Sequence, residues 1–182
     1  MNLLRAYVGL ADRLNERIGV AVSWLTTVLV AVVCYDVFTR YLMKSSLVAI
    51  QELQWHLFAV IFLIGAAYTL KHGKHVRVDV FYNRFPAKTK AWVDFVGSLV
   101  FLLPFCVVAI WCSHTFVANA FLIGEGSPDP GGLPARFILK AAIPVGFLLL
   151  ALQGLALASG SLLKIAGSEA IDPEAEQQGT GS

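Results

Sequence analysis

The chain has 182 residues, of which 57% are hydrophobic and only 14% are charged, and its formal net charge is +2. Soluble domains contain roughly 25% charged and 45–50% apolar residues. Together with a mean hydropathy of +0.70, this composition indicates a membrane protein. The net charge is small and no basic stripe lies outside residues 71–90, so we do not expect a nucleic-acid partner.

The first 17 residues predict an amphipathic helix, because apolar residues recur at helical spacing with charged residues between them. Such a segment can lie along a membrane surface. A cleaved signal peptide is the alternative interpretation. The apolar run that follows is too long for the central part of a signal peptide, and no A-x-A-type site closes it. We therefore interpret residues 1–17 as a retained N-terminal arm.

Four long apolar runs follow the arm, and each has the roughly 20 residues that a helix needs to cross a hydrocarbon core of about 30 Å. We place the spans at about residues 18–38, 48–70, 91–116 and 137–163. The sequence thus predicts an all-α membrane protein with a four-helix membrane domain over residues 18–164. Residues 165–182 are polar, acidic and rich in Gly, and we expect them to be disordered.

Two connecting segments have distinctive compositions. The basic segment between the second and third spans carries apolar residues at spacing i, i+3, i+4 and i+7, namely Val78, Phe81, Tyr82 and Phe85. This spacing predicts a short helix that lies flat on the membrane surface and ends before Pro86. Residues 124–136 are dense in Gly and Pro, which predicts a loop without regular structure. Pro104 lies inside the third span, where proline often kinks a helix.

The distribution of Lys and Arg predicts the orientation, because basic residues accumulate on the cytoplasmic side of a membrane. With four spans, the N-terminal arm, the central segment and the C-terminal end share one side, which has ten basic residues. The opposite side has four. We therefore expect a multi-pass protein of the bacterial inner membrane with both termini in the cytoplasm.

Four polar residues gather near the external ends of the first two spans: Asp36, Arg40, Glu52 and His56. Asp36 and Arg40 are four residues apart on one helical face, so they can pair. We favour a structural network that fixes the first hairpin or meets a partner. A proton or substrate site is the alternative, since ionisable residues deep in a membrane are usually functional, but these residues lie near helix ends.

Several other residues are predicted to position the chain in the membrane. The expected interfacial anchors are Trp55, Phe81, Tyr82, Phe85 and Trp92. The small residues at 65–67 offer a surface that another helix, from this chain or a partner, could approach closely.

The sequence gives little support for catalysis or cofactor binding. A dihaem cytochrome needs facing His pairs inside the bundle, and the four histidines provide at most one such pair. His75 and Asp79 could place two ligands on one helical turn, which is a weak metal signal without a third. No G-x-S-x-G, H-E-x-x-H, P-loop or G-x-G-x-x-G motif occurs. We predict neither an enzyme nor a cofactor.

Transport by this chain alone is also disfavoured. Stand-alone transporters usually contain inverted repeats and broken helices around a site at the membrane midplane. Four spans without a repeat, and with few polar residues, suit a rigid scaffold that packs against a larger partner.

Three stretches together resemble one family. Glu52 opens the second span, KHGKHVRVD (71–79) follows that span, and SPDPGGLPARFILKAAIPVGFLLLALQG (127–154) forms the external loop and the start of the last span. In this order, with four spans, they resemble the small membrane subunit (DctQ-type) of tripartite ATP-independent periplasmic (TRAP) transporters. The similarity extends from about residue 19 to residue 164.

The resemblance implies a function that composition does not. In this family a large multispanning permease (DctM-type) carries the substrate and sodium sites, and a periplasmic binding protein (DctP-type) delivers the substrate, mostly an organic acid. Uptake is driven by an ion gradient. The small subunit enlarges the static scaffold and does no chemistry. The alternative is the membrane anchor of a redox complex, such as a cytochrome-b-like subunit.

The resemblance also gives roles to individual residues. The scaffold or partner-interface candidates are Asp36, Arg40, Glu52, His56, His75, Arg77, Asp79 and Gln153. The loop at 124–136 lies on the side where the binding protein would dock, with Glu125, Asp129 and Arg136 as the candidate contacts. Membrane lipid is the remaining expected partner.

Overall fold

A computed structural model describes residues 2–73 and 85–166, and all regular structure in these ranges is helical. Four of the helical stretches are long and apolar enough to cross a membrane. The elements are α1 (Asn2–Leu42), α2 (Val48–Lys71), α4 (Ala87–Val96), the π-helical turn η1 (Gly97–Leu102), α5 (Leu103–Leu122) and α6 (Phe137–Ile165). The prediction of an all-α protein with four spans is confirmed.

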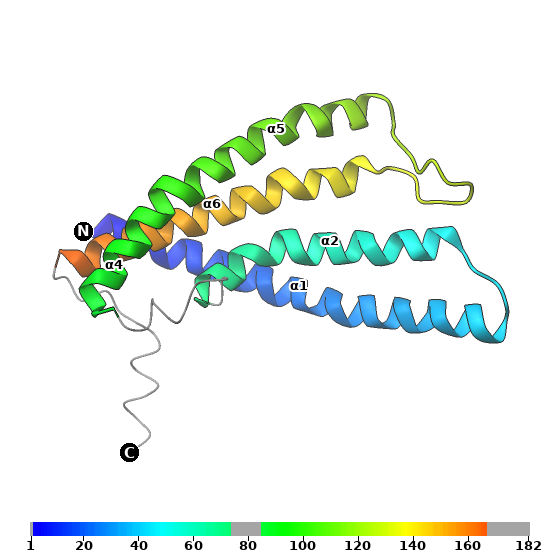
Figure 1. The fold of residues 1–182 in the computed structure, drawn as a ribbon, viewed down its shortest axis with the longest axis horizontal. Helices are drawn as coiled ribbons and strands as arrows, with labels where there is room; N and C mark the ends of the chain where they lie inside the picture. Colours follow the sequence, from blue (N-terminus) through cyan, green and yellow to red (C-terminus); the bar gives the residue numbers. More distant parts are fainter. Residues whose placement is uncertain (1, 74–84, 167–182) are drawn as a thin grey trace, which may run out of the picture.

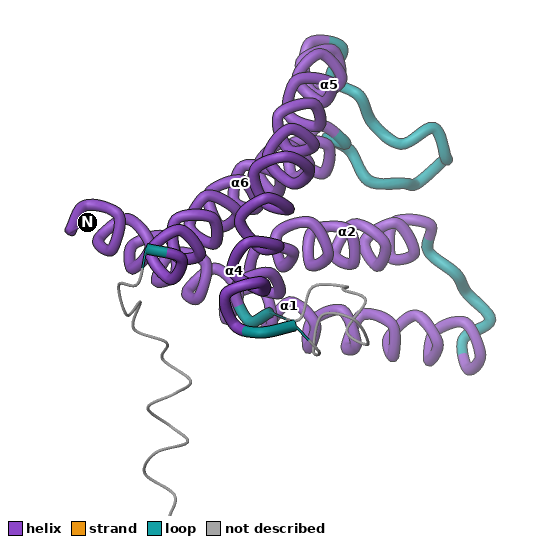
Figure 2. The backbone as a smooth tube through the Cα atoms, turned by 60° about the vertical axis from the view of Figure 1, so that its left-hand side comes forward, coloured by secondary structure: helices purple, strands orange, loops and turns teal. Residues whose placement is uncertain are grey.

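The helices form two antiparallel hairpins, α1 with α2 and α5 with α6 (Figure 1). The hairpins lie close together at the end that holds α4 and the N-terminus, which we call the terminal end. They diverge toward the opposite end, which holds residues 43–47 and 123–136 and which we call the loop end (Figures 1 and 2).

Helix α6 is the centre of the bundle. It contacts α1, α2, α4, η1 and α5. In its most apolar stretch 39% of the residues are buried, against 11% in each of the other three spans. Most side chains of the other helices therefore face outward, as expected for helices surrounded by lipid or by a partner subunit.

Helix α1 contains both the predicted arm and the first predicted span, and it continues from Asn2 to Leu42 without a break. The buried residues Ala11, Asn15, Gly19 and Val22 continue one helical face across that boundary. One packed face on both sides of residue 17 keeps the two parts collinear. Three leucines of the arm, Leu3, Leu10 and Leu14, point away from this face, and Leu3 is 87% exposed.

The third span is longer than predicted and is not purely α-helical. Its helix extends from residue 87 to Leu122, with the π turn η1 in the middle. The Leu103 N–H donates to the carbonyl of Ser98, five residues back. Pro104 follows directly, and it has no N–H to offer the carbonyl four residues back. The wider turn is one of the ways a helix accommodates such a proline.

The two hairpins approach closely where α6 crosses α2. A Cβ atom on Gly146 would lie 2.7 Å from the carbonyl oxygen of Leu63. The small residues at 65–67 were expected to allow a close helix approach, but they differ in burial. Ala67 is 1% exposed, while a Cβ on Gly65 would meet nothing within 4 Å. Residue 146 is thus the position at which α6 and α2 require a glycine.

We predict that Gly146→Ala destabilises the bundle by about 1–3 kcal/mol, because the added methyl group meets backbone that cannot move aside. Thermal unfolding in detergent measures the change. Gly160→Ala in the same helix is the matched control, since its new Cβ would meet nothing within 4 Å. That control should leave stability unchanged or raise it, because alanine favours helix. Equal behaviour of the two variants would contradict the assignment.

Candidate functional site

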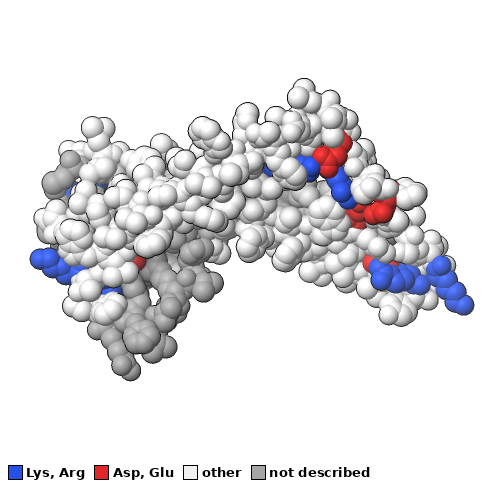
Figure 3. All heavy atoms as spheres, turned by 45° about the horizontal axis from the view of Figure 1, so that its top comes forward, with Lys and Arg blue, Asp and Glu red and all other residues white. Residues whose placement is uncertain are grey.

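Charged side chains gather at the two ends of the molecule, and the middle of the face in Figure 3 is uncharged. At each end, polar side chains from one hairpin bind the other hairpin. We describe these two groups as the loop-end tie and the terminal-end tie.

The loop-end tie is centred on Glu52, in the second turn of α2. Glu52 is 4% exposed. Its carboxylate accepts hydrogen bonds from the Ser127 hydroxyl, from the Leu133 backbone N–H at 2.6 Å and from the Arg136 guanidinium at 2.9 Å. Bonds to an ionised carboxylate are stronger than those between neutral groups. One side chain of the first hairpin therefore holds the loop of the second.

The loop at 124–136 has no helix or strand, as predicted, but its own backbone closes it. The Arg136 N–H donates to the Glu125 carbonyl at 2.8 Å, and the Ser127 N–H donates to the Leu133 carbonyl at 3.0 Å. Gly132 lies against the tie, because a Cβ there would be 2.8 Å from Glu52 Oε2. The loop is therefore a compact closed loop rather than an open connection.

Two of the three residues predicted for docking are engaged inside the chain. Glu125 pairs with Lys140, and Arg136 pairs with Glu52 and lies over the Trp55 ring at 5.5 Å from its centroid. Asp129 is exposed, and its carboxylate has no hydrogen bond or ion pair among the described residues. Asp129 is thus the acidic group that the loop presents outward.

The four polar residues at the first two helix ends do not form a single network. Asp36 pairs with Arg40 within α1, so the predicted pairing of these two is confirmed. Glu52 instead binds the distant loop. The His56 Nδ1 lies 2.6 Å from the Glu52 carbonyl, where it can donate a hydrogen bond, and the centroid of its ring lies 4.0 Å from that of the Trp55 ring, with the planes tilted by 39°.

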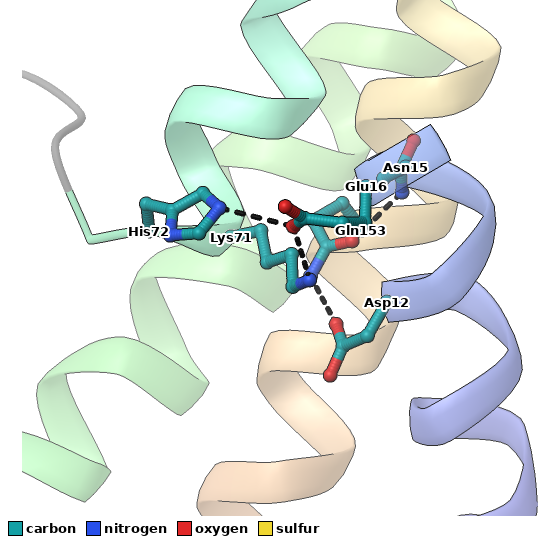
Figure 4. Close-up of polar contacts among 6 residues, drawn as sticks. All are labelled: Asp12, Asn15, Glu16, Lys71, His72 and Gln153. Atoms are coloured by element: carbon teal, nitrogen blue, oxygen red, sulfur yellow. Dashed lines mark hydrogen bonds and ion pairs between the residues drawn. The ribbon is translucent and has the colours of Figure 1, made fainter. Parts of the chain in front are cut away.

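The terminal-end tie joins α6 to α1 through Gln153 (Figure 4). The Gln153 side-chain amide donates to Asp12 Oδ1 at 2.8 Å, and its Oε1 accepts from Asn15 at 2.7 Å. Both Asn15 and Gln153 are buried, at 1% and 4% exposure. This candidate residue is therefore placed inside the chain, between two of its own helices.

The same turn of α1 also binds α2. Glu16 pairs with Lys71 at 2.6 Å and contacts the His72 ring at 3.1 Å (Figure 4). The sequence prediction missed these partners of the arm. A signal was present, since Asn15 falls on the small-residue face between Ala11 and Gly19, but it does not reveal which helix lies opposite.

The remaining predicted residues have mixed positions. Trp55, Trp92 and Phe85 are 42%, 48% and 41% exposed, as interfacial anchors must be. The predicted short surface helix of the central segment lies outside the described residues. So do the remaining predicted anchors and interface candidates, which are His75, Arg77, Asp79, Phe81 and Tyr82. Residues 167–182 of the tail also lie outside them.

The polar groups join helices rather than converge on a reactive centre. No group of three or more His, Cys, Asp or Glu residues that could hold a metal ion occurs in the described parts of the chain. The fold and these contacts define a multi-pass membrane protein in which the buried side chains of Glu52 and Gln153 connect the two hairpins.

Comparison with known proteins identifies the family. The family described as tripartite ATP-independent periplasmic transporters, DctQ component, matches residues 29–163. The ectoine TRAP transporter small permease protein TeaB of Halomonas elongata is 26% identical over 151 residues, which are 82% of this chain and 77% of that protein. The chain belongs to the DctQ family and is a small permease subunit of a TRAP transporter, a transport component and not an enzyme. This assignment does not favour the redox-anchor alternative.

We predict that Glu52→Ala releases the loop at 124–136 and destabilises the protein by about 3 kcal/mol, since it leaves Arg136 without its carboxylate. Hydrogen exchange of the loop should accelerate and the melting temperature should fall. Ser127→Ala removes a single donor and should cost about 1 kcal/mol. Gln51→Ala is the control, because Gln51 is exposed and bonds to Ser46 on the turn before α2. Unchanged loop exchange in Glu52→Ala would contradict the tie.

Proposed function

We propose that this subunit is the static membrane scaffold of an ion-gradient-driven TRAP transporter that imports an organic acid across a bacterial inner membrane. Its partners are a large multispanning permease, which carries the substrate and ion sites, and a periplasmic binding protein. Both termini of the subunit face the cytoplasm. The subunit itself holds no substrate.

The observation that carries the proposal is that the two hairpins are tied at both ends. Glu52 binds the second hairpin at the loop end, and Gln153 binds α1 at the terminal end. A scaffold must keep the relative positions of its helices while its partner moves. Two polar ties at opposite ends of the bundle resist the shear and hinge motions by which transporters change shape.

The buried polar side chains support the same conclusion. The buried charged or amide residues are Asn15, Asp36, Glu52 and Gln153. Each makes a hydrogen bond or ion pair within the chain. A substrate site would need polar groups directed into a shared cavity, whereas Asn15, Glu52 and Gln153 bond to another part of the bundle and Asp36 pairs within α1.

The proposed orientation is supported by the basic residues, which are more numerous at the terminal end than at the loop end. This orientation makes the loop at 124–136 periplasmic. The loop is then the longer of the two connections on the side of the binding protein, with Asp129 at its surface.

The proposal that the substrate is an organic acid is based on membership of the DctQ family. The relative named for ectoine makes ectoine one compound to test, beside dicarboxylates, keto acids and sialic acids. Specificity is expected in the two other components, so the binding protein is the place to measure it.

Reconstitution in proteoliposomes tests the function. We expect uptake only when the large permease, this subunit, the binding protein and an ion gradient are all present. This subunit alone should give none, and the large permease without it should give strongly reduced uptake. Transport by this subunit alone, or a haem spectrum in the purified chain, would overturn the proposal.

Docking can be tested at Asp129 without disturbing the fold. Asp129→Lys should weaken docking of the binding protein by at least about fivefold, since one exposed pair contributes up to about 1 kcal/mol and reversal adds repulsion. Recovery of the large permease should be unchanged. Lys164→Glu is the control, because Lys164 is exposed at the terminal end, on the proposed cytoplasmic side. Wild-type docking by Asp129→Lys would exclude this contact.

A further inference from the structure

The loop at 124–136 contains three residues with a positive φ. These are Gly124 at +60°, Gly131 at +83° and Ala135 at +61°. Glycine adopts this left-handed conformation without a steric penalty, because it has no Cβ. In alanine the Cβ approaches the following carbonyl oxygen, so the same conformation is disfavoured. The loop therefore includes one strained residue, Ala135, beside two glycines that suit their positions.

Hydrogen bonds on both sides of Ala135 hold it in this conformation. Two residues before it, the Leu133 N–H donates to the Glu52 carboxylate at 2.6 Å. Directly after it, the Arg136 side chain donates to the same carboxylate at 2.9 Å, and the Arg136 N–H donates to the Glu125 carbonyl at 2.8 Å. A strained backbone conformation persists only where the surrounding structure determines it. At Ala135 the loop-end tie supplies that restraint.

The Ser127 hydroxyl extends the tie to the exposed part of the loop. It donates to the Glu52 carboxylate and accepts the Asp129 N–H at 3.1 Å, as a hydroxyl can do at the same time. The Asp129 carbonyl in turn accepts the Gly132 N–H at 3.0 Å. The place of the exposed Asp129 carboxylate therefore depends on two hydrogen bonds in series that end at Glu52.

From these contacts we infer that the loop at 124–136 is a strained latch with a tied and a released form, and that the periplasmic binding protein docks on the tied form. In the tied form Glu52 holds Ala135 left-handed and Asp129 in place. In the released form Ala135 has a negative φ and Asp129 loses its fixed position. A preorganised loop binds at a lower entropic cost. The inference rests on the proposed function, because it states which form of the loop meets the binding protein.

The strain at Ala135 and the tie act in opposite directions. Three hydrogen bonds to an ionised carboxylate favour the tied form, whereas relaxation of the Ala135 backbone favours release. Two forms interconvert readily only where their free energies are close. A glycine at position 135 would remove the term that favours release, so Ala135 sets how often the latch opens.

Hydrogen exchange in the purified full-length subunit tests the strain. Ala135→Gly should slow exchange of the Leu133 and Arg136 amides about fivefold, since glycine adopts the left-handed conformation freely. Gly131→Ala should accelerate exchange by a similar factor, because its new Cβ would meet nothing within 4 Å and adds only backbone strain. Lys44→Gly is the matched control.

The control is suited to this comparison because Lys44 also has a positive φ, of +52°, but lies in the turn between α1 and α2. Lys44→Gly should leave the amides of the loop at 124–136 unchanged. Unchanged loop exchange in Ala135→Gly would overturn the latch. So would an equal effect of Lys44→Gly on that loop.

Affinity for the binding protein tests the role of the tied form. Glu52→Ala should raise the dissociation constant by the factor by which it lowers the tied fraction measured by exchange. Glu52 is 4% exposed, so this effect passes through the loop. Adding Ala135→Gly to Glu52→Ala should restore affinity and tied fraction together. Gly131→Ala, which keeps the carboxylate, is a second variant with a lower tied fraction, and its affinity should follow the same relation.

The outcomes separate this inference from the proposed function. If a variant with a released loop docks with wild-type or higher affinity, the scaffold function stands and the inference is excluded. Recovery of the large permease with each variant reports whether the subunit is still assembled. If the wild-type subunit neither recovers the large permease nor docks the binding protein, both the proposed function and the inference fail.

Discussion

The carboxylate of Glu52 makes the contact on which the loop end of the bundle depends. The hairpins diverge toward that end, where Glu52 of the first hairpin meets the loop at 124–136 of the second (Figures 1 and 2). Lipid tails are as apolar as leucine, and no hydrophobic force therefore draws helices together within a membrane. Three hydrogen bonds that the Glu52 carboxylate accepts from one loop connect the two hairpins at this end.

Close packing and polar contacts hold different parts of the bundle together. Near the middle of α2, the absence of a side chain at Gly146 lets α6 rest on the α2 backbone at Leu63. Nearer the terminal end of α6, the Gln153 side chain forms hydrogen bonds with Asp12 and Asn15 of α1. Helix α6 thus combines a close backbone crossing with a polar contact to α1, which explains why it is the most buried of the four.

Hydropathy was enough to predict the four spans, because each is a continuous apolar run with polar ends. It could not predict the ties, since Glu52 binds residues 75 to 84 positions away while Asp36 and Arg40 offered a nearer and plausible network. Gln153 was recognisable in the sequence as a polar residue within a span. Its partners Asp12 and Asn15 could not be predicted, because they depend on how α1 crosses α6. Pro104 predicted a local disturbance, and only the structure shows that it takes the form of a π turn.

The terminal-end contacts of Gln153 and the loop-end contacts of Glu52 share a consequence for biogenesis. The residues that complete both ties, from Ser127 to Gln153, are made after the whole first hairpin has been synthesised. Until then, Glu52 and Asn15 have been inserted without the groups that satisfy them. The first hairpin is therefore an unfinished unit during translation, and arrival of the last helix closes both ends of the protein at once.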